Sequence, residues 1–172
     1  MTRTVMVSGC FDMLHSGHVE FLQRAATQGD QLVVALGADQ TVFDLKGRLP
    51  VCSEEERRFM VQNVACVHQA LISQGSGYLD FEPELRSIRP DIFVVNEDGN
   101  TPDKRRLVES LGIGYVVLHR TPHTGLVPRS TTDLRRIEQL PYRIDLAGGW
   151  LDQPFVSKHH PGSVITISIE PT

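Results

Sequence analysis

Two histidines three residues apart, His15 and His18, follow the first apolar segment of the chain, within the run GCFDMLHSGH. At a junction between a strand and a helix, such a pair lies on one side of the first helical turn, next to unpaired backbone N–H groups. Those amides and the helix dipole favour an anion. Two imidazoles would add donors for the charge that builds up on a phosphoryl group during transfer. Gly9 and Gly17 would let the backbone come close to a nucleotide.

Other uses of this histidine pair are a helix cap, a surface position or a metal site. The spacing differs from that of the usual helical zinc pair, and no third ligand is evident in the sequence. We therefore predict no metal ion bound by protein side chains, and a phosphate-binding turn instead.

The histidines must be positioned by the elements around them, and apolar runs alternate with helix-period segments along most of the chain. Ser53 with Glu56 matches a capping box at the start of one helix, and Ser130 with Asp133 at the start of another that runs to about Gln139. Lys104-Arg105-Arg106 has the pattern of a solvated helix face. Expected strands cover residues 4–8, 32–36, 68–73, 91–96 and 115–119, and expected helices include residues 83–88 and 102–111.

Strand and helix alternate about five times, which predicts a doubly wound, Rossmann-like α/β fold with a five-stranded parallel sheet. We expect the strand order 3-2-1-4-5. Ligands bind such sheets beyond the carboxyl ends of the strands, which is where the turn with His15 and His18 lies.

The composition limits the partners of this 172-residue chain. Its net charge of −4 gives no support to binding of nucleic acid or of a membrane surface. The odd number of cysteines, three, lacks metal-ligand spacing, and no apolar signal region or membrane-length segment is present. These features predict a cytoplasmic protein with reduced thiols.

The pattern changes after Pro141. Residues 142–172 alternate like β structure, and about thirty residues cannot bury enough surface to fold alone. We expect one domain over residues 1–140 and the incomplete beginning of a second over residues 141–172.

The run Gly9-Cys10-Phe11-Asp12 followed by His15-Ser16-Gly17-His18 resembles the signature of the cytidylyltransferase-like nucleotidylyltransferases, a resemblance that covers roughly residues 4–140. The HxGH element is also similar to the HIGH motif of class I aminoacyl-tRNA synthetases. The resemblance implies that His15 and His18 are catalytic. It implies nucleotide binding by the residues of the same turn, Gly9, Cys10, Phe11, Asp12 and Gly17.

The resemblance also assigns roles farther along the chain. Lys46 matches a phosphate-contacting lysine in the loop after the second strand, and is the third expected catalytic residue. Asp39 and Arg57 match positions near the acceptor. Asn96 and Asp98 follow the fourth strand, where glycerol-phosphate cytidylyltransferases have a glycine followed by acidic residues, so Asn96 leaves the base and the acceptor open.

After the fifth strand, relatives carry an Arg-Thr-x-Gly-x-Ser-Thr/Ser-Thr pattern. Here Arg120 and its threonine are separated by several extra residues from Ser130, Thr131 and Thr132. The resemblance implies that these hydroxyls hold the β- and γ-phosphates at a helix start. The insertion leaves Arg120 and Arg129 as competing candidates for the cation that binds phosphate.

The chemistry implied is attack by a phosphomonoester on the α-phosphorus of CTP or ATP, with release of pyrophosphate. Mg²⁺ would arrive with the nucleotide and need few protein ligands. Relatives imply a homodimer.

The tail from Pro141 to Pro154 (PYRIDLAGGWLDQP) resembles the opening of GHMP-type sugar kinases. The glycine- and serine-rich ATP loop of that family is absent from this chain, so we expect no kinase activity. The resemblance implies a parent protein that pairs a sugar kinase with a nucleotidylyltransferase, and thus a sugar or polyol phosphate as acceptor.

Two other functions compete with this one. A non-catalytic module could hold a nucleotide for regulation, although binding alone would not require two histidines. A dinucleotide-dependent oxidoreductase would carry a GxGxxG turn after the first strand, where this chain has its histidines.

Overall fold

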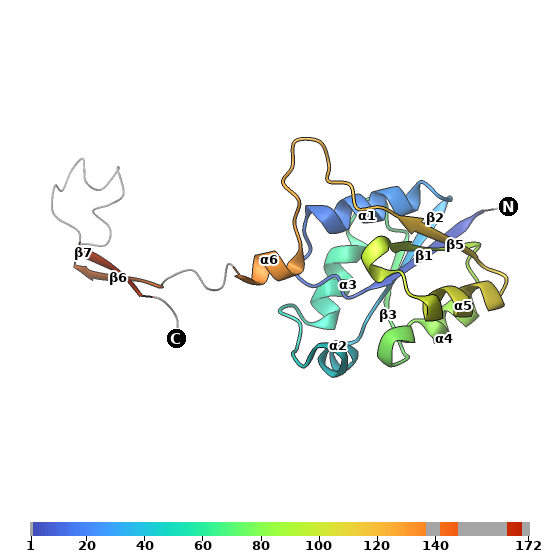
Figure 1. Cartoon of the computed structure of the whole chain (residues 1–172), viewed down its shortest axis with the longest axis horizontal. Helices are drawn as coiled ribbons and strands as arrows, with labels where there is room; N and C mark the ends of the chain where they lie inside the picture. The colour runs from blue at the N-terminus through green and yellow to red at the C-terminus, as the bar shows by residue number, and fades with distance from the viewer. Residues whose placement is uncertain (1, 137–141, 148–164, 170–172) are drawn as a thin grey trace. The chain divides into compact units, whose positions relative to one another are not determined.

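The computed structural model describes residues 2–136, 142–147 and 165–169 (Figure 1). The chain forms two compact units, Met1–Thr131 and Thr132–Thr172. The site described below belongs to the first unit, whereas the predicted nucleotide-binding residue Thr132 belongs to the second.

The first unit contains a five-stranded, all-parallel sheet in the order β3-β2-β1-β4-β5, which confirms the predicted order. In the central strand, Val5 is paired with Leu32 on one side and with Ile92 on the other. The five strands are β1 (Thr4–Gly9), β2 (Gln31–Leu36), β3 (Gln69–Ile72), β4 (Ile92–Asn96) and β5 (Gly114–Leu118).

Helices cover both faces of the sheet (Figure 1). On one face, Leu22 of the first helix and Val61 of the third pack in one apolar cluster with β1 and β2. On the other face, Leu85 and Val108 pack with Met6 and Phe93. The helices are α1 (Ser16–Ala26), α2 (Asp39–Lys46), α3 (Glu54–Gln62), α4 (Glu82–Ile88), α5 (Pro102–Ser110) and α6 (Thr131–Arg136), with short 3₁₀ turns η1 (Gly77–Leu79) and η2 (Glu97–Gly99).

The expectation of a loop around Lys46 is wrong, because this residue ends helix α2. The helix has no side-chain N-cap bond, and Phe43 and Leu45 on it are exposed. A helix this short that leaves apolar residues in solvent lacks the apolar stripe that reveals a helix in sequence. Gly47, at φ 68°, ends it in the left-handed conformation.

In the second unit, β6 (Tyr142–Ala147) and β7 (Ile165–Ile169) pair antiparallel, in agreement with the β structure predicted there. The predicted end of the last helix at Gln139, the domain boundary at residue 140 and most of the kinase-like segment lie outside the described residues. Within the described ranges, no helix has both the length and the apolar character needed to cross a membrane.

Candidate active site

The loop between β1 and α1 is tightly constrained. Phe11 and Met13 both have positive φ, 52° and 50°, which is uncommon for residues other than glycine. The Phe11 ring is buried and meets the His18 ring edge-on, with the centroids 5.5 Å apart. It also fills the space beside Gly9, where a Cβ atom would lie 3.0 Å from the ring. The backbone conformation therefore fixes the position of the histidines that follow.

His15 and His18 cap helix α1 reciprocally. His15 is the N-cap residue, and its Nδ1 accepts a hydrogen bond from the Gly17 N–H at 3.1 Å. The His15 N–H donates to Nδ1 of His18 at 3.4 Å. The rings stack with centroids 3.8 Å apart and an interplanar angle of 23°. Because Nδ1 is the acceptor in both rings, Nε2 is the atom that carries the proton and can donate to a ligand.

Burial and nearby positive charge keep this pair neutral. Burial lowers the pKa of His18 to about 3, with further contributions from His15 and Arg120. Burial also lowers the pKa of His15, followed by the charges of Arg120 and Arg129. At neutral pH the site thus offers two uncharged N–H donors, surrounded by cations.

Gly17 allows close packing at this helix start. A Cβ atom here would lie 3.2 Å from the Arg129 carbonyl oxygen and 3.2 Å from the His15 ring. The absence of a side chain lets the chain before α6 approach the first turn of α1 closely.

Arg57 is fully buried and joins the loops behind the histidines. It donates to the carbonyls of Cys10 at 2.6 Å, Gly37 at 2.8 Å and Cys52 at 3.1 Å, and forms an ion pair with Asp39 at 2.7 Å. These contacts connect the ends of β1 and β2 with the segment before α3. The geometry gives Arg57 and Asp39 a positioning role, while their predicted contact with the acceptor stays a prediction.

Asp12 is also buried and holds a neighbouring segment. Its carboxylate accepts N–H bonds from Val51 at 3.0 Å and Cys52 at 3.2 Å. Its carbonyl accepts the Thr131 hydroxyl at 3.2 Å. The predicted hydroxyl at the start of α6 therefore lies against the histidine loop.

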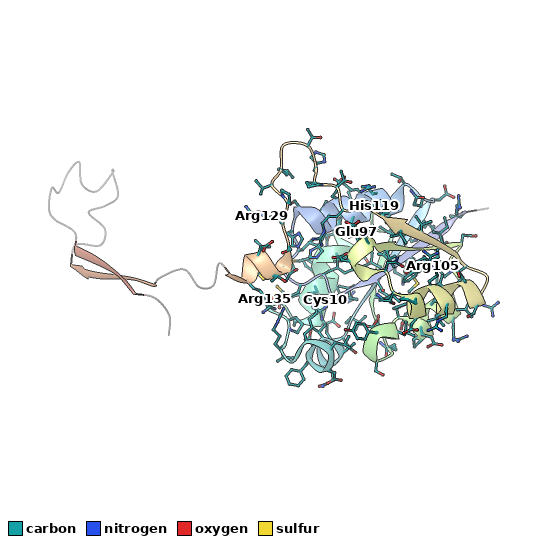
Figure 2. The ribbon with its side chains drawn as sticks, in the orientation of Figure 1. Cys10, Glu97, Arg105, His119, Arg129 and Arg135 are labelled. Carbon is teal, nitrogen blue, oxygen red and sulfur yellow. The ribbon has the colours of Figure 1, made fainter. Side chains whose placement is uncertain are left out.

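Arg120 belongs to a polar network at the ends of β4 and β5. Its guanidinium is paired with Asp98 at 2.9 Å, and its N–H donates to Glu97 at 3.2 Å. The other Glu97 oxygen lies 2.8 Å from Nδ1 of His119, and this bond holds the pKa of Glu97 below its usual value. Glu97 and His119 lie side by side in Figure 2.

A small hollow of about 30 Å³, partly open to solvent, lies between α1 and the segment that follows β5. Its walls include Gly17 and Phe21 on α1, Asn96 at the end of β4, and both Arg120 and Arg129. The structure thus brings both competing arginines to the same hollow, next to the histidines.

Two side chains of α1 fasten the segment after β5 to that helix. Arg24 donates to the His119 carbonyl at 2.6 Å and to the Thr121 hydroxyl at 3.1 Å. Glu20 lies 3.3 Å from Nδ1 of His123. We did not predict either contact, although a spacing of four residues places Glu20 and Arg24 on one helix face.

The other predicted residues are placed as follows. Lys46 is exposed at the end of α2, and its charge contributes to the lowered pKa of His18. Ser130 immediately precedes α6, and Thr132 is the first residue of the second unit. In the described part of the chain, no three His, Cys, Asp or Glu side chains are grouped to hold a metal ion, and the three cysteines are free.

Residues 6–137 match the family model described as cytidylyltransferase-like. FAD synthase from Aciduliprofundum boonei is 40% identical over 100 residues, which are 58% of this chain and 64% of that protein. Bifunctional protein HldE from Helicobacter pylori (strain HPAG1) is 35% identical over 97 residues, 56% of this chain. The match spans only 20% of that bifunctional protein.

Two solved structures share the fold. A lipopolysaccharide core biosynthesis protein from Thermoplasma volcanium GSS1 superposes with a TM-score of 0.60 at 25% identity, covering 72% of this chain and 99% of that one. Pantoate-beta-alanine ligase from Francisella tularensis, at 12% identity and a TM-score of 0.55, covers 78% of this chain and 65% of that one, and shares the fold alone.

Proposed function

Because the chain belongs to the cytidylyltransferase-like family, we propose that it is a nucleotidylyltransferase. It transfers the CMP or AMP moiety of CTP or ATP to a phosphomonoester and releases pyrophosphate.

The observation that carries this proposal is the stacked pair of His15 and His18 at the start of α1. Both Nδ1 atoms are occupied by backbone N–H groups, so both Nε2–H groups remain for a ligand. Two neutral donors beside the positive end of a helix suit phosphate oxygens whose negative charge grows during transfer. Regulatory binding alone would not need such a pair.

In the reaction, an oxygen of the acceptor phosphate attacks the α-phosphorus of the nucleotide. A new P–O bond forms, the bond from the α-phosphorus to the bridging oxygen breaks, and pyrophosphate leaves with the electron pair. No covalent enzyme intermediate is required, since positioning and charge stabilisation account for most of the catalysis in such transfers. His15 and His18 donate to the oxygens of the α-phosphate and the leaving group. Lys46 assists from the end of α2.

The triphosphate extends toward the start of α6. Ser130 and Thr131 offer hydroxyls there, and Arg120 and Arg129 supply positive charge. Arg120 lowers the pKa of both histidines and Arg129 lowers that of His15, which supports this assignment because their positive charge acts on the same side chains. The nucleoside lies at the hollow beside α1, which is lined by both arginines and by the first turn of that helix.

Mg²⁺ accompanies the nucleotide in this proposal and neutralises phosphate charge when bound. An ion held mainly by phosphates and water needs few protein ligands. The proposal therefore does not assign the metal to Asp12, because the carboxylate of Asp12 already accepts backbone N–H groups of the segment before α3.

The acceptor we propose is a sugar or polyol phosphate. The sequence resemblance of the segment after Pro141 to the opening of sugar kinases supports this acceptor. The likeness of the fold to a protein named for lipopolysaccharide core biosynthesis supports it as well. Likeness to an FAD synthase makes a flavin phosphate the competing acceptor. A homodimer is part of the proposal only through the family resemblance.

The test is pyrophosphate release by the full chain with CTP or ATP against a panel of sugar 1-phosphates, polyol phosphates and FMN. We expect release with one nucleotide and at least one acceptor. Tight nucleotide binding in calorimetry without release for any acceptor would instead support the regulatory module.

A further inference from the structure

A second cluster of charged side chains lies on the sheet face that α4 and α5 cover, away from α1. Asp80 directly follows η1, and its Oδ2 lies 3.0 Å from the point where a Cβ atom of Gly37 would stand. Gly37 follows β2 at its carboxyl end, and its carbonyl accepts from Arg57. Asp80 therefore reaches the ligand-binding edge of the sheet from the opposite side to the histidines.

Lys104 on α5 faces the same cluster. It is half-buried, whereas the side chains of Arg105 and Arg106 are exposed and form surface ion pairs. The expectation that all three basic residues form a solvated face is thus wrong for Lys104. Its Nζ lies 5.7 Å from the centroid of the buried Phe81 ring, next in sequence to Asp80. Lys104 is in the first turn of α5, where the helix dipole disfavours a cation.

The charges of this cluster attract each other without touching. Burial lowers the pKa of Lys104, and Asp80 and Asp98 act against that shift. Burial raises the pKa of Asp80, the charge of Lys104 and the Phe81 N–H act against that shift, and the nearby Glu84 adds to it. Among the described residues, however, no carboxylate oxygen lies within 4 Å of the Lys104 ammonium.

Hydrogen-bonding capacity is also unused nearby. Glu84 is 7% exposed, and one of its oxygens accepts from the Gln74 N–H at 3.0 Å. Its other oxygen, and the hydroxyl of the 3% exposed Ser73, are buried without a hydrogen-bond partner in the described part of the chain. Buried polar atoms without partners are costly and rare in folded proteins.

A purely structural ion pair would close to contact, because desolvated charges are stabilised only by close, well-directed partners. A hydroxyl group can instead donate to a carboxylate and accept from an ammonium at once. We propose that Asp80 and Lys104 bind the hydroxyl groups of the acceptor and so select a polyhydroxylated phosphomonoester. This inference rests on the proposed function and specifies the class of its acceptor.

The position of the cluster suits this role. α1 and α5 cover opposite faces of the sheet, and the neighbouring strands β1 and β4 that precede them end at the same edge, where doubly wound sheets bind ligands. Asp98 connects the two sides, since its charge acts on Lys104 and it is paired with Arg120, which in turn acts on both histidines. An acceptor held at Asp80 and Lys104 would direct its phosphate along this edge toward the nucleotide.

The test compares the full-length wild type with the Asp80→Asn and Lys104→Met variants in pyrophosphate release. Glucose 1-phosphate, mannose 1-phosphate, glycerol 3-phosphate and FMN serve as acceptors. We expect the KM for the hydroxyl-rich acceptor to rise about tenfold to a hundredfold in each variant. The KM and calorimetric Kd for the nucleotide should change less than about twofold. Arg106→Met, on the exposed side of α5, is the matched control and should leave both constants unchanged.

Lys104→Arg keeps the positive charge and should therefore lose less acceptor affinity than Lys104→Met. If Lys104→Met lost affinity only because it failed to fold, the positive charge of the arginine would make no such difference. Unchanged acceptor KM values in both variants, or use of FMN alone, would overturn the inference while leaving the proposed function intact. Absence of release with every acceptor would overturn the proposed function itself, and the inference with it.

Discussion

Single residues in this protein combine structural and chemical roles. His15 and His18 cap a helix through Nδ1, which leaves Nε2 as the protonated nitrogen that our proposal assigns to the ligand. A helix cap and a phosphate site were among the interpretations that the sequence allowed for the pair, and in the structure the cap fixes the tautomer that phosphate binding would use. Arg57 is different, because its donors face carbonyls and Asp39 behind the site. A sequence cannot distinguish such a buried arginine from one that contacts a ligand.

The lowered pKa of His18 predicts how stability varies with pH. Its pKa falls from 6.5 to about 3 on folding, so below pH 6.5 the unfolded chain binds a proton that the folded chain does not. The free energy of unfolding should therefore fall as the pH falls from 6.5 toward 3, and be unaffected by this group above about pH 7. Between pH 7 and pH 5 we expect a loss of about 2 kcal/mol from His18.

Urea unfolding at several pH values measures this dependence. In His18→Asn the loss of unfolding free energy between pH 7 and pH 5 should be smaller by that amount. An equal loss in the variant and in the wild type would show that His18 is not held neutral.

The buried guanidinium of Arg57 predicts a large loss of stability on its removal. Arg57→Leu leaves the carbonyls of Cys10 and Gly37 and the Asp39 carboxylate without their donor, and should lower the free energy of unfolding by about 3–5 kcal/mol. The neighbouring Arg58→Leu, which breaks only a surface pair, should change it by less than about 1 kcal/mol. Urea titration of the two variants compares them directly, and similar losses would contradict the role of Arg57.

At the scale of elements, the strand order and most helix positions could be predicted because their apolar residues are periodic and their caps are specific. The Ser53–Glu56 capping box at the start of α3 is one example, with both reciprocal bonds present. Helix α2 was missed because it buries only Thr41 and Val42. The Asp80–Lys104 cluster was missed because η1 and α5 are brought together only by packing on the far sheet face, which no local pattern encodes.

The start of α1 predicts an unusual response to Gly17→Ala. Alanine normally stabilises a helix relative to glycine, but here the methyl group would press on the His15 ring and the Arg129 carbonyl. Displacing the histidines by a few tenths of an ångström should lower kcat for pyrophosphate release by about tenfold. Gly99→Ala, where a Cβ atom meets nothing within 4 Å, should retain full activity. Equal kcat values would show that the spacing at Gly17 has no functional importance.

At the scale of the whole molecule, the family match over residues 6–137 and the first compact unit describe nearly the same part of the chain. Among the residues whose burial is described, the buried apolar core extends from Val5 to Ile113, all within the first unit. We therefore expect a fragment of residues 1–137 to unfold cooperatively and to bind nucleotide with the Kd of the full chain. Calorimetry on the two proteins measures this, and a tenfold weaker fragment would show that the second unit contributes to the site.

The central claim is that the Nε2–H groups of the histidine pair stabilise the transferring phosphate. It is tested most directly by kcat for pyrophosphate release in His18→Asn and His18→Gln. Asparagine keeps an acceptor at the Nδ1 position, and so the cap, but has no donor at the Nε2 position, whereas glutamine can place an amide N–H there. We predict that His18→Asn lowers kcat by about 10²–10³-fold with an unchanged nucleotide Kd, and that His18→Gln retains a substantially larger part of the activity. A His18→Asn enzyme with the kcat of the wild type would contradict the account.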